Sequence, residues 1–233
     1  MKTDDYQSPN KARTYAQQRF TGGRETISKD EIYLIKKWIS DSVKIKRAIF
    51  LDLGAGTGRV TSELFYFQPQ KIYALDSSVS MLDYLKAHLK TSQQKLLQTI
   101  NAFSDKVPLK KEGVDVVIAL HLFKHLNNPE STISEISRVL KKGGYFIFDV
   151  LNKNSLIQVR RGTCSVTSEK GIQELLNENG FKVIKISYMH FFGETIYGLL
   201  GKHMGKLLHP LDLFISKSNL KMGTKIFILA QKQ

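Results

Sequence analysis

The sequence predicts an α/β protein with a doubly wound, mostly parallel sheet of seven strands. From residue 48 onward, short apolar runs alternate with amphipathic stretches, a pattern typical of βαβ units. Two of the apolar runs end in an acidic residue, Asp52 and Asp76, and three glycines at alternate positions follow the first. The carboxyl ends of parallel strands meet at one edge of such a sheet, so we expect a ligand site there.

Two helical patterns precede the sheet, near 11–19 and 28–40. The second starts at Ser28, a candidate N-cap with Glu31 at the spacing of a capping box. Apolar residues then recur at helical intervals, so this helix is expected to pack against the rest of the chain.

The remaining elements follow from the same apolar periodicity. Strands are expected near 48–53, 71–75, 96–100, 114–119, 144–150, 181–188 and 225–230. Helices are expected near 59–66, 78–90, 129–141 and 168–179. We expect one domain over 1–233, divided into an N-terminal helical cap (1–45), a core (46–188), an insertion (189–222) and a last strand (223–233).

The composition is that of an ordinary globular protein, with 42% hydrophobic and 24% charged residues. The single cysteine, Cys164, excludes an internal disulfide and offers no metal-ligand spacing. No apolar signal-peptide core opens the chain, and no apolar run approaches the length of about 20 residues that spans a bilayer. We therefore expect a cytoplasmic protein without a transmembrane segment.

The formal net charge of +14 allows two interpretations. Its basic residues are spread in small groups, such as Lys36-Lys37 and Arg160-Arg161, and form no single run. This distribution favours a solvated lysine-rich surface. Attraction to nucleic acid, anionic lipid or an acidic substrate remains the alternative.

The glycine loop discriminates between two kinds of nucleotide site. Glycine allows positive φ and lets a ligand lie against bare backbone. A dinucleotide fingerprint requires G-x-G-x-x-G, but here Arg59 stands at the third glycine position and Gly58 comes one residue early. The preceding Asp52 would repel a pyrophosphate and suits a ligand with an ammonium group. A tight turn without a ligand is the alternative.

The pattern Asp52-x-Gly54-x-Gly56-x-Gly58 resembles the first motif of the class I S-adenosylmethionine-dependent methyltransferases. The resemblance extends over about 48–187 and is closest to the small-molecule group, type 11-like, that includes quinone-biosynthesis enzymes. It implies a Rossmann-like methyltransferase fold with S-adenosyl-L-methionine as the cofactor and no metal.

The resemblance also assigns residues to the cofactor. It places Asp76 on the ribose and Met81 near the adenosine, with core packing as the alternative for Met81. Asn101 stands where the family has an acid that accepts a hydrogen bond from the adenine amino group, and an amide oxygen can still accept it. The expected cofactor contacts are Tyr15, Arg19, Asp52, Gly54, Ala55, Gly56, Gly58, Asp76, Ser77, Met81, Asn101, Ala102, Phe103 and Leu120.

His121 is the candidate catalytic residue. It follows the fourth expected strand, where the family lines the sulfonium end of the cofactor pocket. A neutral imidazole is a suitable general base near neutral pH. A packed histidine is the alternative. Of the N-terminal contacts, Arg19 and Tyr15 are expected near the cofactor carboxylate, with a solvated helix face as the alternative.

The function that these residues predict is methyl transfer to a small-molecule acceptor on O, N or C. An RNA or protein methyltransferase is the alternative that the positive charge favours, although nucleic acid is not the preferred partner. A cofactor-binding protein without turnover is the non-enzyme alternative. The sequence leaves the acceptor and the oligomeric state open.

The insertion 189–222 interrupts the sheet before its last strand, where we expect a substrate lid. Its apolar residues recur at helical spacing and would give one face. They are Ile196, Leu199, Leu200, His203, Met204, Leu207 and Leu208. This face could instead extend the core, or, with Lys202 and Lys206, rest on a membrane surface.

Overall fold

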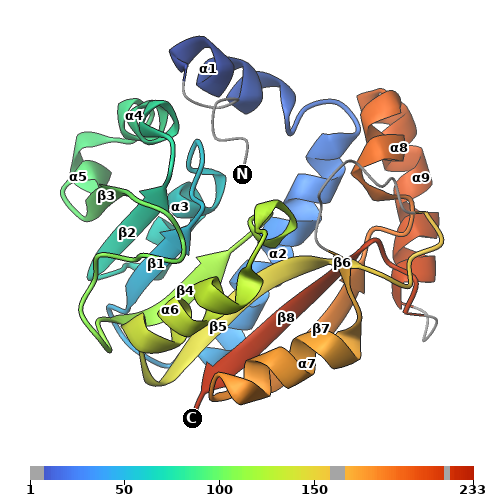
Figure 1. Cartoon of the computed structure of the whole chain (residues 1–233). Coiled ribbons are helices and arrows are strands. Elements are labelled where there is room, and N and C mark those ends of the chain that lie inside the picture. The colour runs from blue at the N-terminus through green and yellow to red at the C-terminus, as the bar shows by residue number, and fades with distance from the viewer. Residues whose placement is uncertain (1–7, 158–165, 218–220) are drawn as a thin grey trace.

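The computed structural model describes residues 8–157, 166–217 and 221–233. A twisted sheet forms the centre, and helices cover both of its faces (Figure 1). The strands are β1 (Ile49–Leu53), β2 (Lys71–Asp76), β3 (Leu97–Asn101), β4 (Val114–Ala119), β5 (Leu140–Asn152), β6 (Val166–Thr167), β7 (Phe181–Met189) and β8 (Lys225–Lys232). The α-helices are α1 (Pro9–Gln18), α2 (Arg24–Ser42), α3 (Arg59–Leu64), α4 (Val79–Ala87), α5 (Thr91–Gln94), α6 (Pro129–Val139), α7 (Glu169–Glu178), α8 (Gly193–Leu199) and α9 (Lys202–Lys217).

The sheet confirms the predicted fold class. Seven strands lie in the order β3-β2-β1-β4-β5-β8-β7, and the two-residue β6 pairs with β5. The strands from β3 to β5 are mutually parallel, whereas β8 runs antiparallel to both β5 and β7. The carboxyl ends of β1, β2, β4 and β5 therefore meet at one edge, which is the ligand edge of such sheets.

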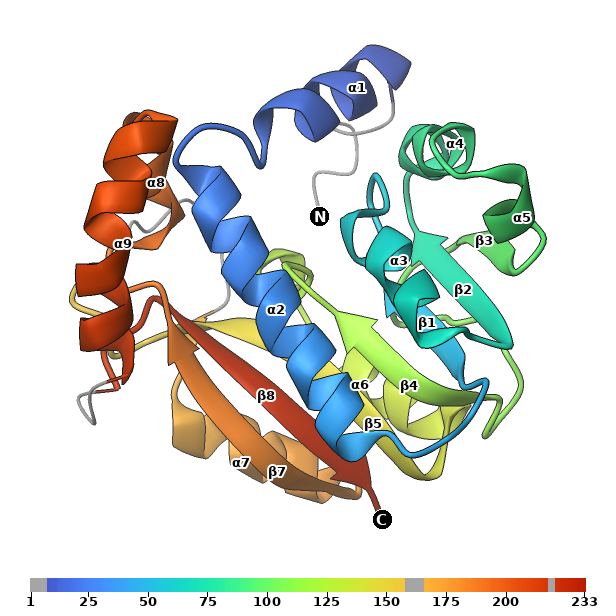
Figure 2. The same ribbon diagram turned by 180° about the vertical axis from the view of Figure 1, so that it is seen from behind.

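Two apolar layers hold the helices on the sheet. Helices α6 and α7 pack on one face through Ile133, Ile136 and Leu176. Helices α2 and α3 pack on the other face through Trp38, Ile39 and other buried residues (Figure 2). Strand β4 lies between both layers and is buried along its whole length, which explains its unbroken apolar sequence.

Helix α2 begins one turn earlier than predicted. It starts at Arg24, so Ser28 lies inside the helix and the predicted capping box is wrong. The turn is set instead by Gly22, whose φ is +60°, and by Gly23, whose amide donates to Leu200 O at 3.2 Å. Glu31 is consequently directed into the protein and is fully buried.

The insertion folds as two helices that lie against α2 (Figure 2). One continuous apolar face, as expected from the spacing, does not form, because the chain breaks between Leu199 and Lys202. Gly205 faces α2 instead, since a Cβ at this position would lie only 2.8 Å from Gly23 Cα. Leu199 and Leu207 are left 84% and 74% exposed.

Candidate functional site

The glycine loop between β1 and α3 has the backbone of a ligand cradle. Gly54, Gly56 and Gly58 adopt φ values of +76°, +54° and +87°. A Cβ on Gly56 would meet nothing within 4 Å, so its backbone faces open space. A Cβ on Gly58 would lie 2.1 Å from Leu85 Cδ1, so this glycine lets α3 pack closely on α4. The loop thus offers bare backbone at Gly56 and a fixed anchor at Gly58.

Asp76 at the end of β2 holds this loop in place. One carboxylate oxygen accepts from the Gly56 amide at 2.8 Å, and the other accepts from the Ser78 amide at 2.9 Å. Burial raises the pKa of Asp76, and these backbone hydrogen bonds act in the opposite direction. The backbone of Ser77 also acts on this carboxylate, which has about four acceptor positions, so capacity remains to accept from a ribose hydroxyl.

Asn101 lies beside Asp76 at the end of β3, as its sequence position suggests. Its side-chain nitrogen donates to Asp76 O at 3.1 Å, and the amide of Ala102 donates to the same carbonyl at 3.2 Å. This contact uses the side-chain nitrogen of Asn101 and leaves its side-chain oxygen as an acceptor. Phe103 follows with half of its surface exposed, 53%. These residues fit an adenine-binding edge.

Other predicted contacts lie inside the protein. Asp52 is buried and accepts from Thr61 Oγ1 at 2.6 Å rather than lying at the mouth of the loop. Met81 and Leu120 are 4% and 6% exposed, and Ala55 is 8% exposed. Ala55 donates its amide to Leu75 O. Contact of any of these side chains with the cofactor stays a prediction.

The segment between α1 and α2 covers the end of β4. The ring of Phe20 meets the His121 ring edge-on at 5.9 Å, and Tyr15 meets Phe20 in the same way at 6.2 Å. The Arg59 guanidinium lies over the same Phe20 ring, with its Cζ 4.3 Å from the ring centroid. Arg19 forms an ion pair with Glu194 of α8. Its predicted role at the cofactor carboxylate stays a prediction.

Glu31 is the centre of a buried ion cluster that the sequence analysis missed. Its carboxylate lies 2.7 Å from Lys225 Nζ, 3.0 Å from Arg59 Nη2 and 2.9 Å from His121 Nε2. Burial raises the pKa of Glu31, but contacts with His121, Lys225 and Arg59 outweigh it and hold the pKa well below its usual range. Helical phase could have predicted the burial of Glu31, because Glu31 lies four residues before Ile35 and therefore on the packed face of α2.

Lys225 joins two further acids to this cluster. Its ammonium lies 2.7 Å from Glu194 Oε1 and 3.8 Å from Asp149 Oδ2. Burial lowers the pKa of Lys225, but Glu194 and Glu31 raise it above its ordinary value. Oxygen and nitrogen atoms of Glu31, His121 and Glu194 also lie within 4.8 Å of one another, a spacing that could suit a metal ion. The Lys225 ammonium already supplies the cation between these two carboxylates.

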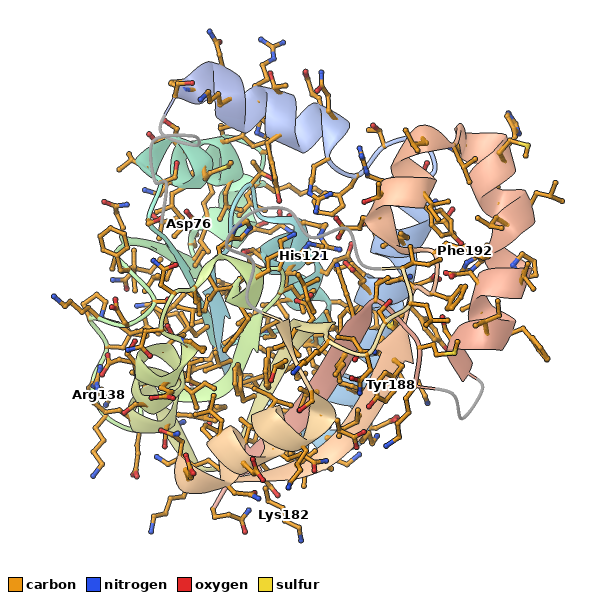
Figure 3. The ribbon with its side chains drawn as sticks, turned by 45° about the vertical axis from the view of Figure 1, so that its right-hand side comes forward. Asp76, His121, Arg138, Lys182, Tyr188 and Phe192 are labelled. Carbon is orange, nitrogen blue, oxygen red and sulfur yellow. The ribbon has the colours of Figure 1, made fainter. Side chains whose placement is uncertain are left out.

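His121 is held in an unusual backbone conformation at the centre of this edge. Its φ is +59°, and its amide donates to Asp149 Oδ1 at 2.5 Å. Burial lowers the pKa of the imidazole more than the neighbouring carboxylates raise it, so the ring is neutral near pH 7. Figure 3 shows His121 and Asp76 at the same end of the sheet, below α1.

The two ring nitrogens of His121 differ in their surroundings. Nε2 lies 2.9 Å from the Glu31 carboxylate, which accepts hydrogen bonds, and 3.0 Å from the Lys225 ammonium, which donates them. Nδ1 lies 3.3 Å from Glu194 Oε1 and has no hydrogen-bond partner among the described residues. Buried charged groups thus hold the ring on both sides.

Replacing Asp52 by Asn tests the burial of this carboxylate. Burial raises the pKa of Asp52 from 3.8 to about 6, so its contribution to stability is complete below pH 3.8 and is lost as the pH rises through 6. Between about pH 4 and pH 7, the free energy of unfolding of the wild type should fall by about 3 kcal/mol relative to Asp52→Asn. Urea unfolding at several pH values measures this difference, and parallel pH curves would contradict it.

Replacing Lys225 by Met tests the ion cluster. The change leaves Glu31 and Glu194 buried without their shared cation, so the free energy of unfolding should fall by about 3–5 kcal/mol. A second change, Glu194→Gln, should recover part of this loss. The control is Lys29→Met, whose side chain is 70% exposed in a surface pair with Glu25 and should cost at most about 1 kcal/mol. Equal melting of the Lys225 and Lys29 variants would refute the cluster's role.

Comparison with known proteins agrees with this geometry. Residues 51–148 match the family model of a methyltransferase domain. An uncharacterized methyltransferase of Schizosaccharomyces pombe is 33% identical over 52% of this chain and 46% of its own length. A malonyl-[acyl-carrier protein] O-methyltransferase of Paenibacillus is 26% identical over 58% of this chain and 55% of its own. The chain thus spans about half the length of these curated relatives.

A solved structure shares the fold. The S-adenosylmethionine-dependent methyltransferase of Aquifex aeolicus superposes with a TM-score of 0.62 at 17% identity, covering 97% of this chain and 99% of that one. The glycine loop, Asp76 and the end of β4 all fall within the matched residues 51–148. Residues 51–148 therefore match a methyltransferase domain, and the fold is that of a solved S-adenosylmethionine-dependent methyltransferase.

Proposed function

We propose that this chain transfers a methyl group from S-adenosylmethionine to a small-molecule acceptor on O, N or C. The observation that carries the proposal is the shared edge of the sheet. The glycine loop with Asp76 lies at the ends of β1 and β2, and His121, whose Nδ1 has no hydrogen-bond partner among the described residues, lies at the end of β4 beside them. The proposed cofactor cradle and the proposed base are therefore neighbours.

The residues of the cradle fit S-adenosylmethionine group by group. The open backbone at Gly56 would lie against the ligand, Asp76 would accept from the ribose hydroxyls, and Asn101 would accept from the adenine amino group. When bound, the cofactor supplies a methyl group activated by a sulfonium. Transfer to a good nucleophile then requires alignment and removal of one proton.

His121 would remove that proton. In the tautomer that donates from Nε2 to Glu31, Nδ1 would be the basic nitrogen, and the Asp149 contact fixes the backbone. Because Glu31 is itself neutralised by Lys225 and Arg59, it orients the ring without needing to take the proton. The relative that is named as an O-methyltransferase supports an oxygen acceptor within this proposal.

The domain organisation that fits this function is one methyltransferase unit over 1–233. We infer that 46–188 binds the cofactor and that 1–45 forms a cap over it, with 223–233 completing the sheet. Helix α1 lies above α4 at the ligand edge, as a cap requires (Figure 1). The insertion 189–222 would border the acceptor side through Glu194, which contacts both His121 and Lys225.

Replacing Asp76 by Ala should weaken S-adenosylmethionine binding. Loss of a charge-assisted hydrogen bond to the ribose costs about 1.5–3 kcal/mol per bond, which isothermal titration calorimetry resolves as a rise in Kd. Asp83→Ala, which removes an exposed carboxylate from α4, is the matched control and should leave Kd unchanged. Binding of NAD with no heat from S-adenosylmethionine would overturn the cofactor assignment.

Replacing His121 by Asn should separate catalysis from binding. Asn tolerates the positive φ of this position, so the backbone is retained. Release of S-adenosylhomocysteine across a panel of small acceptors should fall about 10²–10⁴-fold, while calorimetric affinity for S-adenosylmethionine stays the same. Because the pKa of His121 is lowered, wild-type turnover should persist somewhat below pH 6.5. Unchanged turnover in His121→Asn would make His121 a packed residue only.

A further inference from the structure

The outer side of α9 carries a line of exposed apolar side chains. Met204, Leu207, Leu211 and Phe214 are 54%, 74%, 51% and 76% exposed. Their spacing of three, four and three residues puts them on one face of the helix. We name these four residues the α9 stripe.

The opposite side of α9 is packed, so the stripe is not a consequence of a loose helix. Gly205 lies against Gly23 of α2. Asp212 accepts from the Phe192 amide at 3.0 Å and from the Tyr197 hydroxyl at 3.3 Å. These contacts fix which side of α9 faces outward, and Figure 3 shows side chains of this helix standing away from the fold.

The polar groups beside the stripe are basic. Lys202, His203 and Lys206 are exposed, whereas the acid of α9, Asp212, is only 1% exposed. Lys202 lies 3.1 Å from Glu25 but keeps 54% of its side chain exposed. The outer side of α9 therefore combines large apolar groups with positive charge, and it presents no carboxylate of its own.

We propose that the α9 stripe docks the protein on the surface of an anionic membrane. Leucine and phenylalanine side chains enter the boundary between headgroups and acyl chains, and lysines beside them contact lipid phosphates. The net charge of +14 adds long-range attraction to such a surface. Within the described part of the chain, no helix has the length and apolar character to cross a bilayer, which agrees with a helix that lies on the surface.

A second copy of the chain fits this face less well. A two-fold interface would bring the same patch of both copies together. Lys206 and His203 would then lie near their own counterparts, and like charges across an interface disfavour association. Anionic lipid instead supplies the opposite charge and an apolar layer at the same depth.

Vesicle flotation tests the proposal. The wild type should float with vesicles of phosphatidylcholine containing about one-third phosphatidylglycerol, and much less with phosphatidylcholine alone. The variant Leu207→Ser/Phe214→Ser should bind at least about tenfold more weakly, because both apolar side chains enter the bilayer. Lys206→Gln should reduce binding by about fivefold. The control Tyr33→Ser/Leu156→Ser removes side chains that are 70% and 72% exposed elsewhere, and it should bind like the wild type.

Two results would overturn the proposal. The first is absence of wild-type binding to the anionic vesicles, or equal binding by Leu207→Ser/Phe214→Ser. The second is a concentration-dependent dimer in light scattering that this variant converts to a monomer, which would assign the stripe to self-association. Circular dichroism melting should be the same for all variants. If the double variant melts early, Lys206→Gln, a change at an exposed polar residue, decides the outcome.

Discussion

The buried contact between Glu31 and Lys225 determines how the two ends of the chain meet over the sheet. Glu31 lies on the second helix and Lys225 opens the last strand, 194 positions later. Both contact His121 at the end of β4. Without Lys225, the fully buried carboxylate of Glu31 would keep Arg59 as its cation but lose half of its charge partners, at a cost of several kcal/mol. The ion pair therefore fixes α2, β8 and His121 relative to one another.

Such a cluster contributes position more than net stability. Removing charges from water costs about as much as their attraction returns, so apolar residues of similar size could stabilise the fold equally well. Apolar residues would not hold the His121 ring in one defined orientation. His121 keeps its positive φ and its ring orientation because Asp149 binds its amide while Glu31 and Lys225 contact its Nε2. We interpret the cluster as the support that holds the imidazole for its proposed role.

Much of the fold and of the cofactor cradle could be predicted from the sequence, because both depend on local patterns. A strand such as β4 is buried on both faces and must be apolar throughout, so its run is visible without a structure. The glycine loop needs positive φ at three positions, and glycine reports that need directly. Asp76 follows because strand β2 ends at the same edge as β1.

The ion cluster around His121 could not be predicted, because its residues meet only through tertiary packing. Glu31 has the spacing of a capping box from Ser28, and the local pattern gives no sign of the distant Lys225. In the sequence, Arg59 stands at the position of the third glycine of a dinucleotide fingerprint. In the structure it contacts both Glu31 and the Phe20 ring. The prediction of one apolar face for the insertion 189–222 was wrong for a related reason. Helical spacing was continued across a break at 200–201, so side chains of two helices were assigned to one face.

The two halves of the site differ in how ready they are for ligands. The cradle is already shaped, because Asp76 holds Gly56 through a bond that a ribose need not break. The proposed base is shielded on one side, because the Phe20 ring meets the His121 ring edge-on and Arg59 lies over Phe20. Arg59 also binds Glu31, so movement of Phe20 is linked to the ion cluster through one guanidinium. Approach to His121 from this side therefore depends on the position of Phe20 and of the segment joining α1 to α2.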